Sequence, residues 1–283
     1  GNTDQNLIML DGITVYNPSH LGGVFSNFIV DGIKEAELIK GAYNAEYGGR
    51  LSAVLNVISR EGNKNKFKGK VNLSLLSAQS TLEGPFYKGA WVLSGRRTYF
   101  DLVLPKVLPD NINENIPPYY FYDIQSHVFS DITSKDRVSF SYYSGIDDLL
   151  FDTFGLNGRW GNNTVSGHYR RVFSERLVGN ILIANSRFFT EFGLGGDNGL
   201  VSYNEIDDKT LSADFSWFKS SNSTLSKYDP FSFIYEEYIF KNPSLLHEYG
   251  FSKNPGSSDE MKYNLLLNIV EPKSEYSELI LKF

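Results

Sequence analysis

The strongest constraint on the fold is a two-residue alternation of side-chain character that recurs after residue 67. Residues 71–75, 138–143 and 211–217 each place apolar or aromatic side chains on one face and mostly small or polar side chains on the other. A period of two is typical of strands that are buried on one side only. The alternation predicts about seven or eight strands between Phe67 and Phe218, most of them about 10 residues or longer.

The connections between these strands alternate in length. Short polar turns are predicted at 87–89, 134–136, 174–176 and 220–223, whereas 102–118, 151–161 and 193–208 are predicted as long irregular segments rich in Pro or in Gly, Asn and Asp. A β-sandwich shows no such bias, but outer-membrane barrels join their strands in this way. We therefore expect an up-and-down meander with the short turns at one rim and the long segments at the other.

The first 62 residues have a different pattern. Leu7–Leu10 is a short apolar run that ends at the turn signal Asp11-Gly12, and Val54–Ile58 is apolar on both faces, as in a covered strand. Residues 29–40 predict a short helix followed by a strand over Glu35–Lys40. The predicted fold class is therefore mainly β: a small α/β unit followed by the strands of a transmembrane antiparallel β-barrel. The pattern weakens after residue 227, where 261–270 fits a strand or a helix.

Composition excludes some classes of protein and leaves others open. No run of about 18 apolar residues predicts a transmembrane helix. The net charge of -6 disfavours a nucleic-acid-binding protein, which needs a basic surface. The lack of cysteine excludes disulfides and thiolate chemistry. A mean hydropathy of -0.28 fits a soluble protein, but it also fits a barrel with a polar interior.

A short motif carries a resemblance to a known family. The turn Tyr47-Gly48-Gly49-Arg50 leads into the strand Val54–Arg60 and, with residues 7–15 and 33–41, resembles the end of the plug domain of TonB-dependent outer-membrane receptors. The resemblance is most specific over residues 7–62 and looser over 63–225, where segments near 82–85 and 94–99 resemble Bacteroidetes-type members. The positions that match the plug motif are Asp11, Gly12, Glu46, Tyr47, Gly48, Gly49, Arg50 and Asn56.

The resemblance implies a domain organisation and a function. Residues 1–62 would be the C-terminal part of a plug domain, and 63–283 the N-terminal part of a barrel in the bacterial outer membrane. Such receptors are not enzymes and need no cofactor; they take up a siderophore, glycan or other nutrient. The TonB-ExbB-ExbD energy complex would act through an upstream segment that precedes Gly1, and outer-membrane lipid would surround the barrel. Because plugged barrels have about 22 strands, we expect this chain to be too short to close one.

Candidate chemical groups favour structural roles. The four histidines, His20, His127, His168 and His247, share no metal-ligand spacing, so no metal site is predicted. Asp147-Asp148 lies near a predicted strand end, and it fits a solvated loop mouth better than a cation site. No catalytic motif is present.

An aromatic cluster, a single tryptophan and a pair of arginines remain. Residues 119–122 and Trp160 fit an aromatic girdle at the membrane interface better than a stacking platform for a ligand. Arg96 and Arg97 must point to opposite faces of a strand. One is expected to reach the lipid headgroups. For the other, a contact with acidic plug groups such as Glu46 stays open.

One alternative from another class is a small outer-membrane barrel of about eight strands with a structural or adhesion role. A secreted enzyme on a β-scaffold ranks third, because no catalytic constellation supports it. The length of the intact reading frame separates the first two hypotheses, since a full receptor needs several hundred further residues.

Overall fold

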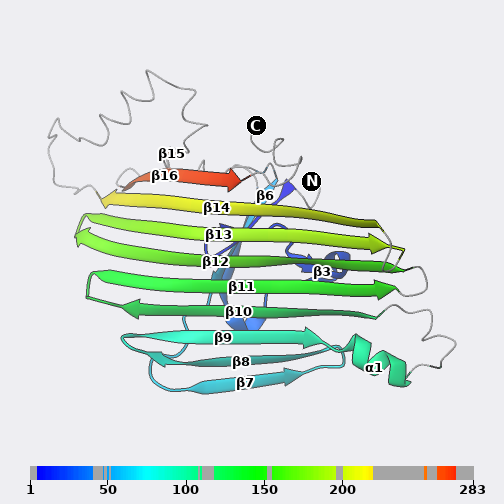
Figure 1. The fold of residues 1–283 in the computed structure, drawn as a ribbon. Helices are drawn as coiled ribbons and strands as arrows, with labels where there is room; N and C mark the ends of the chain where they lie inside the picture. The colour runs from blue at the N-terminus through cyan, green and yellow to red at the C-terminus, as the bar shows by residue number, and fades with distance from the viewer. Residues whose placement is uncertain are drawn as a thin grey trace.

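A computed structural model describes residues 5–40, 47, 50, 52–107, 109, 118–151, 155–195, 200–218, 252–253 and 260–271. A long antiparallel sheet forms one layer, and a small unit built from residues 5–60, the N-terminal unit, packs against one of its faces (Figure 1). Among the described residues, none of the helices has the length and apolar character needed to span a membrane.

The N-terminal unit is organised around a four-stranded sheet. Its strand order is β2-β1-β6-β5, with β1 parallel to β6 and the other neighbours antiparallel. The strands are β1 (Leu7–Leu10), β2 (Ile13–Thr14), β5 (Ile33–Lys40) and β6 (Ala53–Ser59), and a hairpin of β3 (Ser19–His20) and β4 (Phe25–Ser26) stands apart from them. The predicted strand over Val54–Ile58 is confirmed as the central strand β6, and Val54 and Val57, which point to opposite faces of it, are both buried.

Helical structure in this unit is limited to two 3-10 turns, η2 (Leu21–Gly23) and η3 (Val30–Gly32). The short helix predicted within residues 29–40 is thus the single turn η3, and the strand that follows begins at Ile33 rather than Glu35. Pairing explains the difference: Ile33 already lies opposite Ser59 of β6, and a bulge between Ile33 and Glu35 shifts the register.

The long sheet contains ten strands in the order β15-β16-β14-β13-β12-β11-β10-β9-β8-β7. Eight of them, β7–β14, lie between Lys68 and Phe218, as the alternation predicts, and the segment 261–270 lies in β16. A helix, α1 (Phe100–Val107), follows β9. The strands are β7 (Lys68–Leu73), β8 (Ser77–Phe86), β9 (Gly89–Thr98), β10 (Tyr119–Asp131), β11 (Asp136–Phe151), β12 (Leu156–Ser174), β13 (Leu177–Leu194), β14 (Leu200–Phe218), β15 (Ser252–Lys253) and β16 (Glu260–Glu271).

The meander topology is confirmed, but two of the predicted loops are wrong. The turns at 87–89, 134–136 and 174–176 all lie at the left end of the sheet in Figure 1; the fourth, at 220–223, lies outside the described residues. At the other end, 156–161 and 200–208 are strand rather than loop. Their Gly, Asn and Asp residues are tolerated because these strands are paired on both sides, as where Gly158 lies opposite both Leu149 and Phe192. Of the third segment, 102–107 continues α1, and 108 and 110–117 are outside the described residues.

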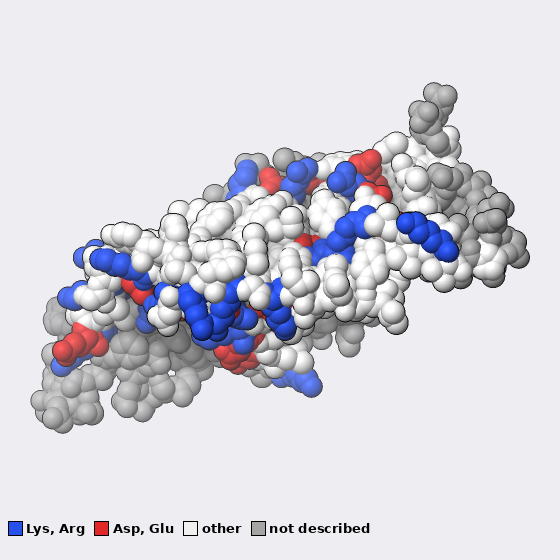
Figure 2. Space-filling model, turned by 90° about the horizontal axis from the view of Figure 1, so that it is seen from below, with Lys and Arg blue, Asp and Glu red and all other residues white. Residues whose placement is uncertain are grey.

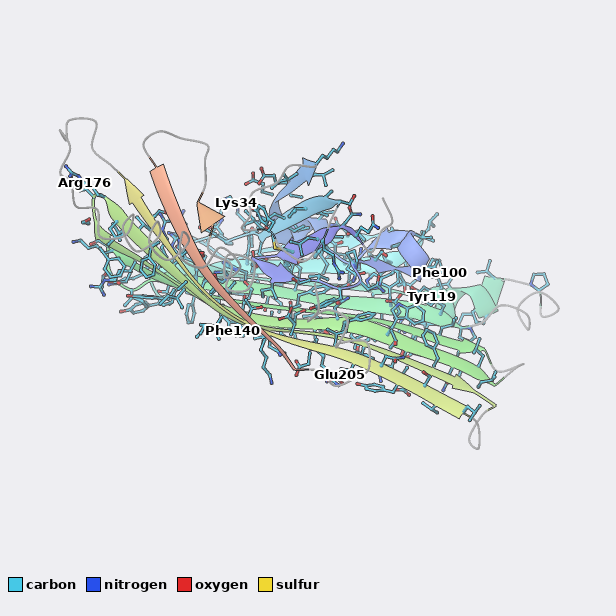
Figure 3. All side chains as sticks on the ribbon, turned by 90° about the horizontal axis from the view of Figure 1, so that it is seen from above. Lys34, Phe100, Tyr119, Phe140, Arg176 and Glu205 are labelled. Atoms are coloured by element: carbon cyan, nitrogen blue, oxygen red, sulfur yellow. The ribbon has the colours of Figure 1, made fainter. Side chains whose placement is uncertain are left out.

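The two faces of the sheet differ in polarity. Figure 3 shows the N-terminal unit on one face, the inner face, with Phe140 and Glu205 on the opposite, outer face. Partly exposed apolar side chains lie on the outer face. Figure 2 looks at the molecule from below, from the side of β7, and shows uncharged residues between groups of charged ones. These outer residues include Val138, Phe140, Ile181, Ile183, Leu211 and Phe215; the side chain of Trp217, also predicted to point outward, lies outside the described ones.

The start of β9 gives a first testable prediction. A Cβ added at Gly89 would lie 1.9 Å from the backbone oxygen of Phe129 in β10, so the β9–β10 pair would have to separate there. Gly89→Ala is therefore expected to destabilise the sheet by about 2 kcal/mol or more. Gly167→Ala is the matched control, because a Cβ at Gly167 meets no atom within 4 Å. For each variant, the temperature at which the folded band disappears on a gel measures the stability of the sheet. Equal decreases in this temperature for the two variants would contradict the prediction.

Candidate functional site

The candidate site is the contact between the N-terminal unit and the inner face of the long sheet. Side chains on alternate positions of β9–β14 point into this contact, and most of them are polar and buried. They bond to carbonyl groups or side chains of the unit rather than packing against apolar surface, as in the bonds from Ser186 to the Thr14 oxygen (2.6 Å) and from Gln125 to the Gly32 oxygen (3.3 Å). Because successive side chains of a strand point to opposite faces, only every second residue of these strands reaches the unit.

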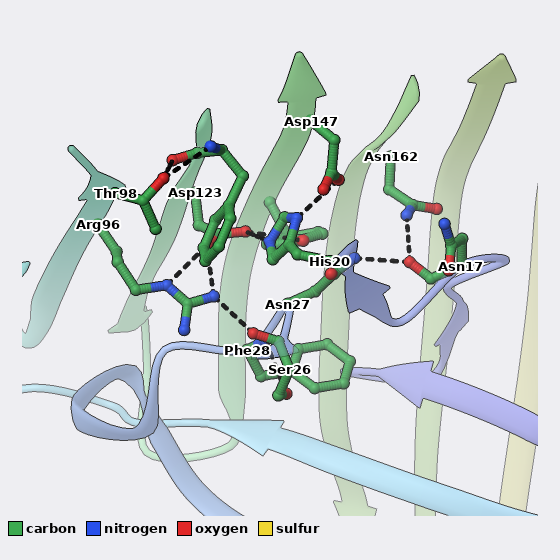
Figure 4. Close-up of polar contacts among 12 residues, drawn as sticks. Asn17, His20, Ser26, Asn27, Phe28, Arg96, Thr98, Asp123, Asp147 and Asn162 are labelled. Atoms are coloured by element: carbon green, nitrogen blue, oxygen red, sulfur yellow. Dashed lines mark hydrogen bonds and ion pairs between the residues drawn. The ribbon is translucent and has the colours of Figure 1, made fainter. Parts of the chain in front are cut away.

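A fully buried histidine lies at the centre of the contact (Figure 4). His20 ends β3, and its ring stacks on Phe121 of β10 with a centroid separation of 3.9 Å. Its Nδ1 lies 2.7 Å from Oδ2 of Asp147 in β11, and its Nε2 lies 2.8 Å from Oδ1 of Asp123 in β10. The two neighbouring strands thus hold the ring between two carboxylates.

Burial would by itself lower the pKa of His20, because it removes water from the imidazolium. The hydrogen bonds and charges of Asp123 and Asp147 outweigh that effect, so the pKa is raised above its usual value of 6.5. His20 therefore favours its charged form in this site.

Asp123 connects the histidine to an arginine. Nε and Nη2 of Arg96 in β9 bind Oδ2 of Asp123 at 2.8 and 2.5 Å, and Nη2 also donates to the backbone oxygen of Ser26 at 2.5 Å. The guanidinium lies over the ring of Phe121, 5.1 Å from its centroid. Arg96 therefore joins the long sheet, called the wall from here on, to β4 of the N-terminal unit.

Arg97 points to the other face of β9, as alternation requires. It pairs with Asp101 of α1 at 2.7 Å and lies over the ring of Tyr120. Its contacts are thus with the wall and α1, and they lie away from the N-terminal unit.

The Asp11-Gly12 turn forms a second attachment to the wall. Both residues have positive φ, 51° and 82°, which a tight turn between β1 and β2 requires. Oδ1 of Asp11 accepts the backbone N–H of Ser59, and Oδ2 accepts the hydroxyl of Ser141 in β11, each at 2.8 Å. His168 of β12 lies 2.9 Å from the Asp11 backbone oxygen. Asp11 thus stabilises the turn and fixes it to the wall.

Amide side chains leave several buried acceptors without a hydrogen-bond partner among the described residues. Asn27 and Asn162 both donate to the backbone oxygen of Asn17, at 2.6 and 2.7 Å. The side-chain oxygens of Asn27, Asn162 and Gln125 are buried and accept no hydrogen bond from a described residue. Buried polar groups of this kind are the ones to which ordered water binds in proteins.

The sequence matches no protein-family model and no curated protein. Among solved structures, a mutant of the ferric enterobactin receptor PfeA from Pseudomonas aeruginosa aligns at TM-score 0.53 and 14% identity, over 76% of this chain and 38% of its own. The ferric-catecholate import receptor Fiu from E. coli K12 aligns at TM-score 0.53 and 12% identity, over 77% and 37%. The siderophore receptor PiuA from Acinetobacter baumannii aligns at TM-score 0.53 and 13% identity, over 77% and 36%.

These neighbours are TonB-dependent receptors. The chain has the fold of a TonB-dependent receptor. It spans less than two fifths of the length of the solved receptors above. At these identities the likeness concerns the fold, which agrees with the resemblance found at 7–62.

Within this receptor fold, the predicted motif residues are only partly brought together. Asp11 and Gly12 reach the wall, whereas Asn56 lies within β6 between Met9 and Glu37. The hydroxyl of Tyr16 donates to Asp208 of β14 at 2.8 Å, and burial and the charge of Asp208 raise the pKa of this hydroxyl. The positive charge of Arg50 acts in the opposite direction. Tyr47 is also described and partly buried. Glu46, Gly48 and Gly49 lie outside the described residues, so the suggested contact between Glu46 and an arginine stays a prediction.

Some residues of the long sheet differ from the sequence-based interpretation. Asp147 is buried in β11 rather than solvated, because its carboxylate binds His20 and the hydroxyl of Tyr119. Tyr119 and Phe121 point inward beneath the unit, so only Tyr120 and Tyr122 of this cluster fit an outer girdle. Trp160 shares the inward parity of Asn162 and stacks on Phe192 at 6.0 Å.

Sequence reasoning missed His20 as the centre of the contact. The sequence did contain a signal. Positions 123, 125 and 127 share one face of a strand and are all polar, so this face is not one that packs on an apolar core. No three His, Asp or Glu side chains in the described ranges are arranged to hold a metal ion. In the cluster around His20, carboxylates already face both ring nitrogens.

Proposed function

We propose that the chain is the N-terminal part of a barrel wall with part of its plug, in an outer-membrane receptor that imports a nutrient. Residues 1–62 would belong to the plug domain and 63–283 to the barrel. The receptor fold supports this proposal. The observation that carries it is the polarity of the two faces: buried polar side chains bind the unit on the inner face, and apolar side chains cover the outer face.

The chemistry of the inner contact suits a plug that moves. An apolar core resists separation because each exposed apolar surface costs free energy in water. Hydrogen bonds between polar side chains and backbone oxygens can instead be exchanged for bonds to water at small net cost. The bonds of Ser186 and Gln125 to the unit are of this kind.

The outer face suits contact with lipid. Val138, Phe140, Ile183 and Leu211 are partly exposed there, and the strands of 16 to 19 residues exceed the length of about ten that a tilted transmembrane strand needs. The remaining length would extend beyond the bilayer. The energy for import would come from the TonB-ExbB-ExbD complex.

The substrate class remains a siderophore, glycan or other nutrient. The neighbouring receptors are described as receptors for ferric enterobactin, ferric catecholates and siderophores. A small closed barrel with a structural role is less well supported, because β7 and β15 lie at opposite ends of the described sheet and do not pair.

Removal of the N-terminal unit tests the proposal without knowledge of the substrate. Deletion of residues 5–60 from the intact gene product should leave a folded, heat-modifiable wall with an open lumen. Cells that produce it should become sensitive to vancomycin, which is too large for ordinary porins. The parent chain and the Asp101→Ala variant serve as closed controls. An eight-stranded barrel has an interior filled by side chains, so a folded deletion variant without increased sensitivity would overturn the proposal.

A further inference from the structure

The geometry around His20 determines its protonation state. Both ring nitrogens lie at hydrogen-bond distance from carboxylate oxygens, 2.7 Å for Nδ1 and 2.8 Å for Nε2. A carboxylate accepts hydrogen bonds and cannot donate them, whereas a neutral imidazole donates from one nitrogen only. In the neutral form, a nitrogen lone pair would therefore face an oxygen lone pair at one of the two contacts. Both contacts are attractive only when both nitrogens carry a proton.

We propose that protonated His20 is a charge-dependent latch that holds the β3–β4 hairpin on the wall, and that loss of its proton releases the hairpin locally. The inference rests on this contact and not on transport, although in a receptor the hairpin would belong to the plug. The stacking on Phe121 holds the ring plane in place, so a neutral ring cannot rotate to avoid the unfavourable contact without leaving the site.

The surrounding charges balance only with the imidazolium. The groups that face His20 come from three strands: Arg96 of β9, Asp123 and Tyr119 of β10, and Asp147 and Tyr143 of β11. The two carboxylates offset the arginine and a charged histidine. A neutral His20 would leave one uncompensated negative charge among fully or almost fully buried groups, which is costly in a medium of low polarity.

The direction of the pH dependence follows from the raised pKa of His20. A raised folded-state pKa means that the latch contributes fully below the ordinary value of 6.5 and is lost as the pH rises through the raised value. Between 6.5 and the raised value, each pH unit should weaken the latch by up to about tenfold, and above the raised value the weakening should level off.

The segment beside the latch is suited to local release. Leu21, Gly22 and Gly23 follow His20 with φ of 48°, 63° and 109°, and residues 21–24 are all exposed. Leu21 also donates its backbone N–H to Asp147 at 3.3 Å, so it would lose that bond with the latch. The bonds of Ser186 to Thr14 and of Gln125 to Gly32 contain no titratable group. The rest of the unit should therefore stay in place when the hairpin moves.

A spin label at position 24 tests this proposal. Residues 1–283 contain no cysteine, so Val24→Cys gives a single attachment site once any cysteine elsewhere in the intact gene product is replaced by serine, and Val24 is 66% exposed. Electron paramagnetic resonance on the intact gene product in detergent, from about pH 5 to about pH 9, should show an immobile label at low pH. The ratio of mobile to immobile label should rise by up to about tenfold per pH unit between 6.5 and the raised pKa of His20, and should level off above it. An unchanged ratio across this range would overturn the proposal.

Two variants separate a charge-dependent latch from a merely structural contact. His20→Gln lacks the titrating proton and should give a mobile label at every pH. Asp147→Asn should give an immobile label at every pH, because its amide can donate to Nδ1 of a neutral ring that donates from Nε2 to Asp123. Its oxygen can still accept from Leu21 and Tyr119. A pH profile of Asp147→Asn like that of the parent chain would overturn the proposal.

His168→Gln is the matched control. His168 also joins the wall to the unit, but it contacts a backbone oxygen, that of Asp11, and no carboxylate at hydrogen-bond distance is recorded for it. Its replacement should leave the profile at position 24 unchanged. A label at position 34 on the exposed strand β5 reports whether the whole unit moves. Equal pH-dependent mobility at positions 24 and 34 would contradict a local release.

Discussion

Replacing Asp123 by alanine is expected to weaken the attachment of the N-terminal unit by about 3–5 kcal/mol. Asp123 is fully buried and binds Arg96, His20 and Tyr143 at 2.5 to 3.2 Å. Its removal would leave a guanidinium that is 12% exposed, and a histidine that is 0% exposed, without their shared counter-ion. A buried charge that loses its partner costs far more than the pair contributes when intact.

Urea titration of the intact gene product in detergent, monitored by a probe on the N-terminal unit, measures this loss of free energy. Asp101→Ala is the matched control, because Asp101 also pairs with an arginine of β9 at 2.7 Å, but its partner Arg97 is 41% exposed. Exposed pairs contribute about 0–1 kcal/mol. Similar small effects for both variants would show that the cluster around His20 does not carry the attachment.

The long sheet could be predicted from sequence because one local rule governs it. Period-two alternation depends only on neighbouring residues, and it places residues 138–143 and 211–217 in strands that the structure confirms. The same rule fails where composition resembles a loop. Residues 156–161 and 200–208 contain Gly, Asn and Asp, yet cross-strand pairing with β11 and β13 keeps them extended. Tertiary pairing overrides local propensity at these positions.

The site could not be predicted because its contacts join distant parts of the chain. His20 and Asp147 are 127 residues apart, and Tyr16 and Asp208 are 192 apart. A pair of acidic residues such as Asp147-Asp148 resembles a solvated strand end when read alone. Only the register of β10 and β11 shows that Asp123 and Asp147 share the inner face. The Asp11-Gly12 turn was predictable, since its positive φ values are a local requirement.

Alternation alone also leaves open which face is covered. In a soluble sheet the apolar face packs on the core, and the polar face meets water. Here the polar inner face is covered by the N-terminal unit, and the apolar side chains of Phe140 and Ile183 remain partly exposed on the other side. The covering of the polar face distinguishes this arrangement from a soluble sheet, and the proposed contact of the outer face with lipid rests on it.

Residues 1–283 produced alone are expected not to give a stable outer-membrane barrel. Among the described residues, β7 forms one edge of the long sheet and the short β15 the other, and these strands do not pair. Each unsatisfied backbone group at such an edge costs several kcal/mol in lipid. The exposed side chains of Val138, Phe140 and Phe215 would favour aggregation in water. The segment with a signal peptide should therefore show no heat-modifiable band in outer-membrane fractions. A folded, heat-modifiable species would instead favour closure of a small barrel and the structural alternative.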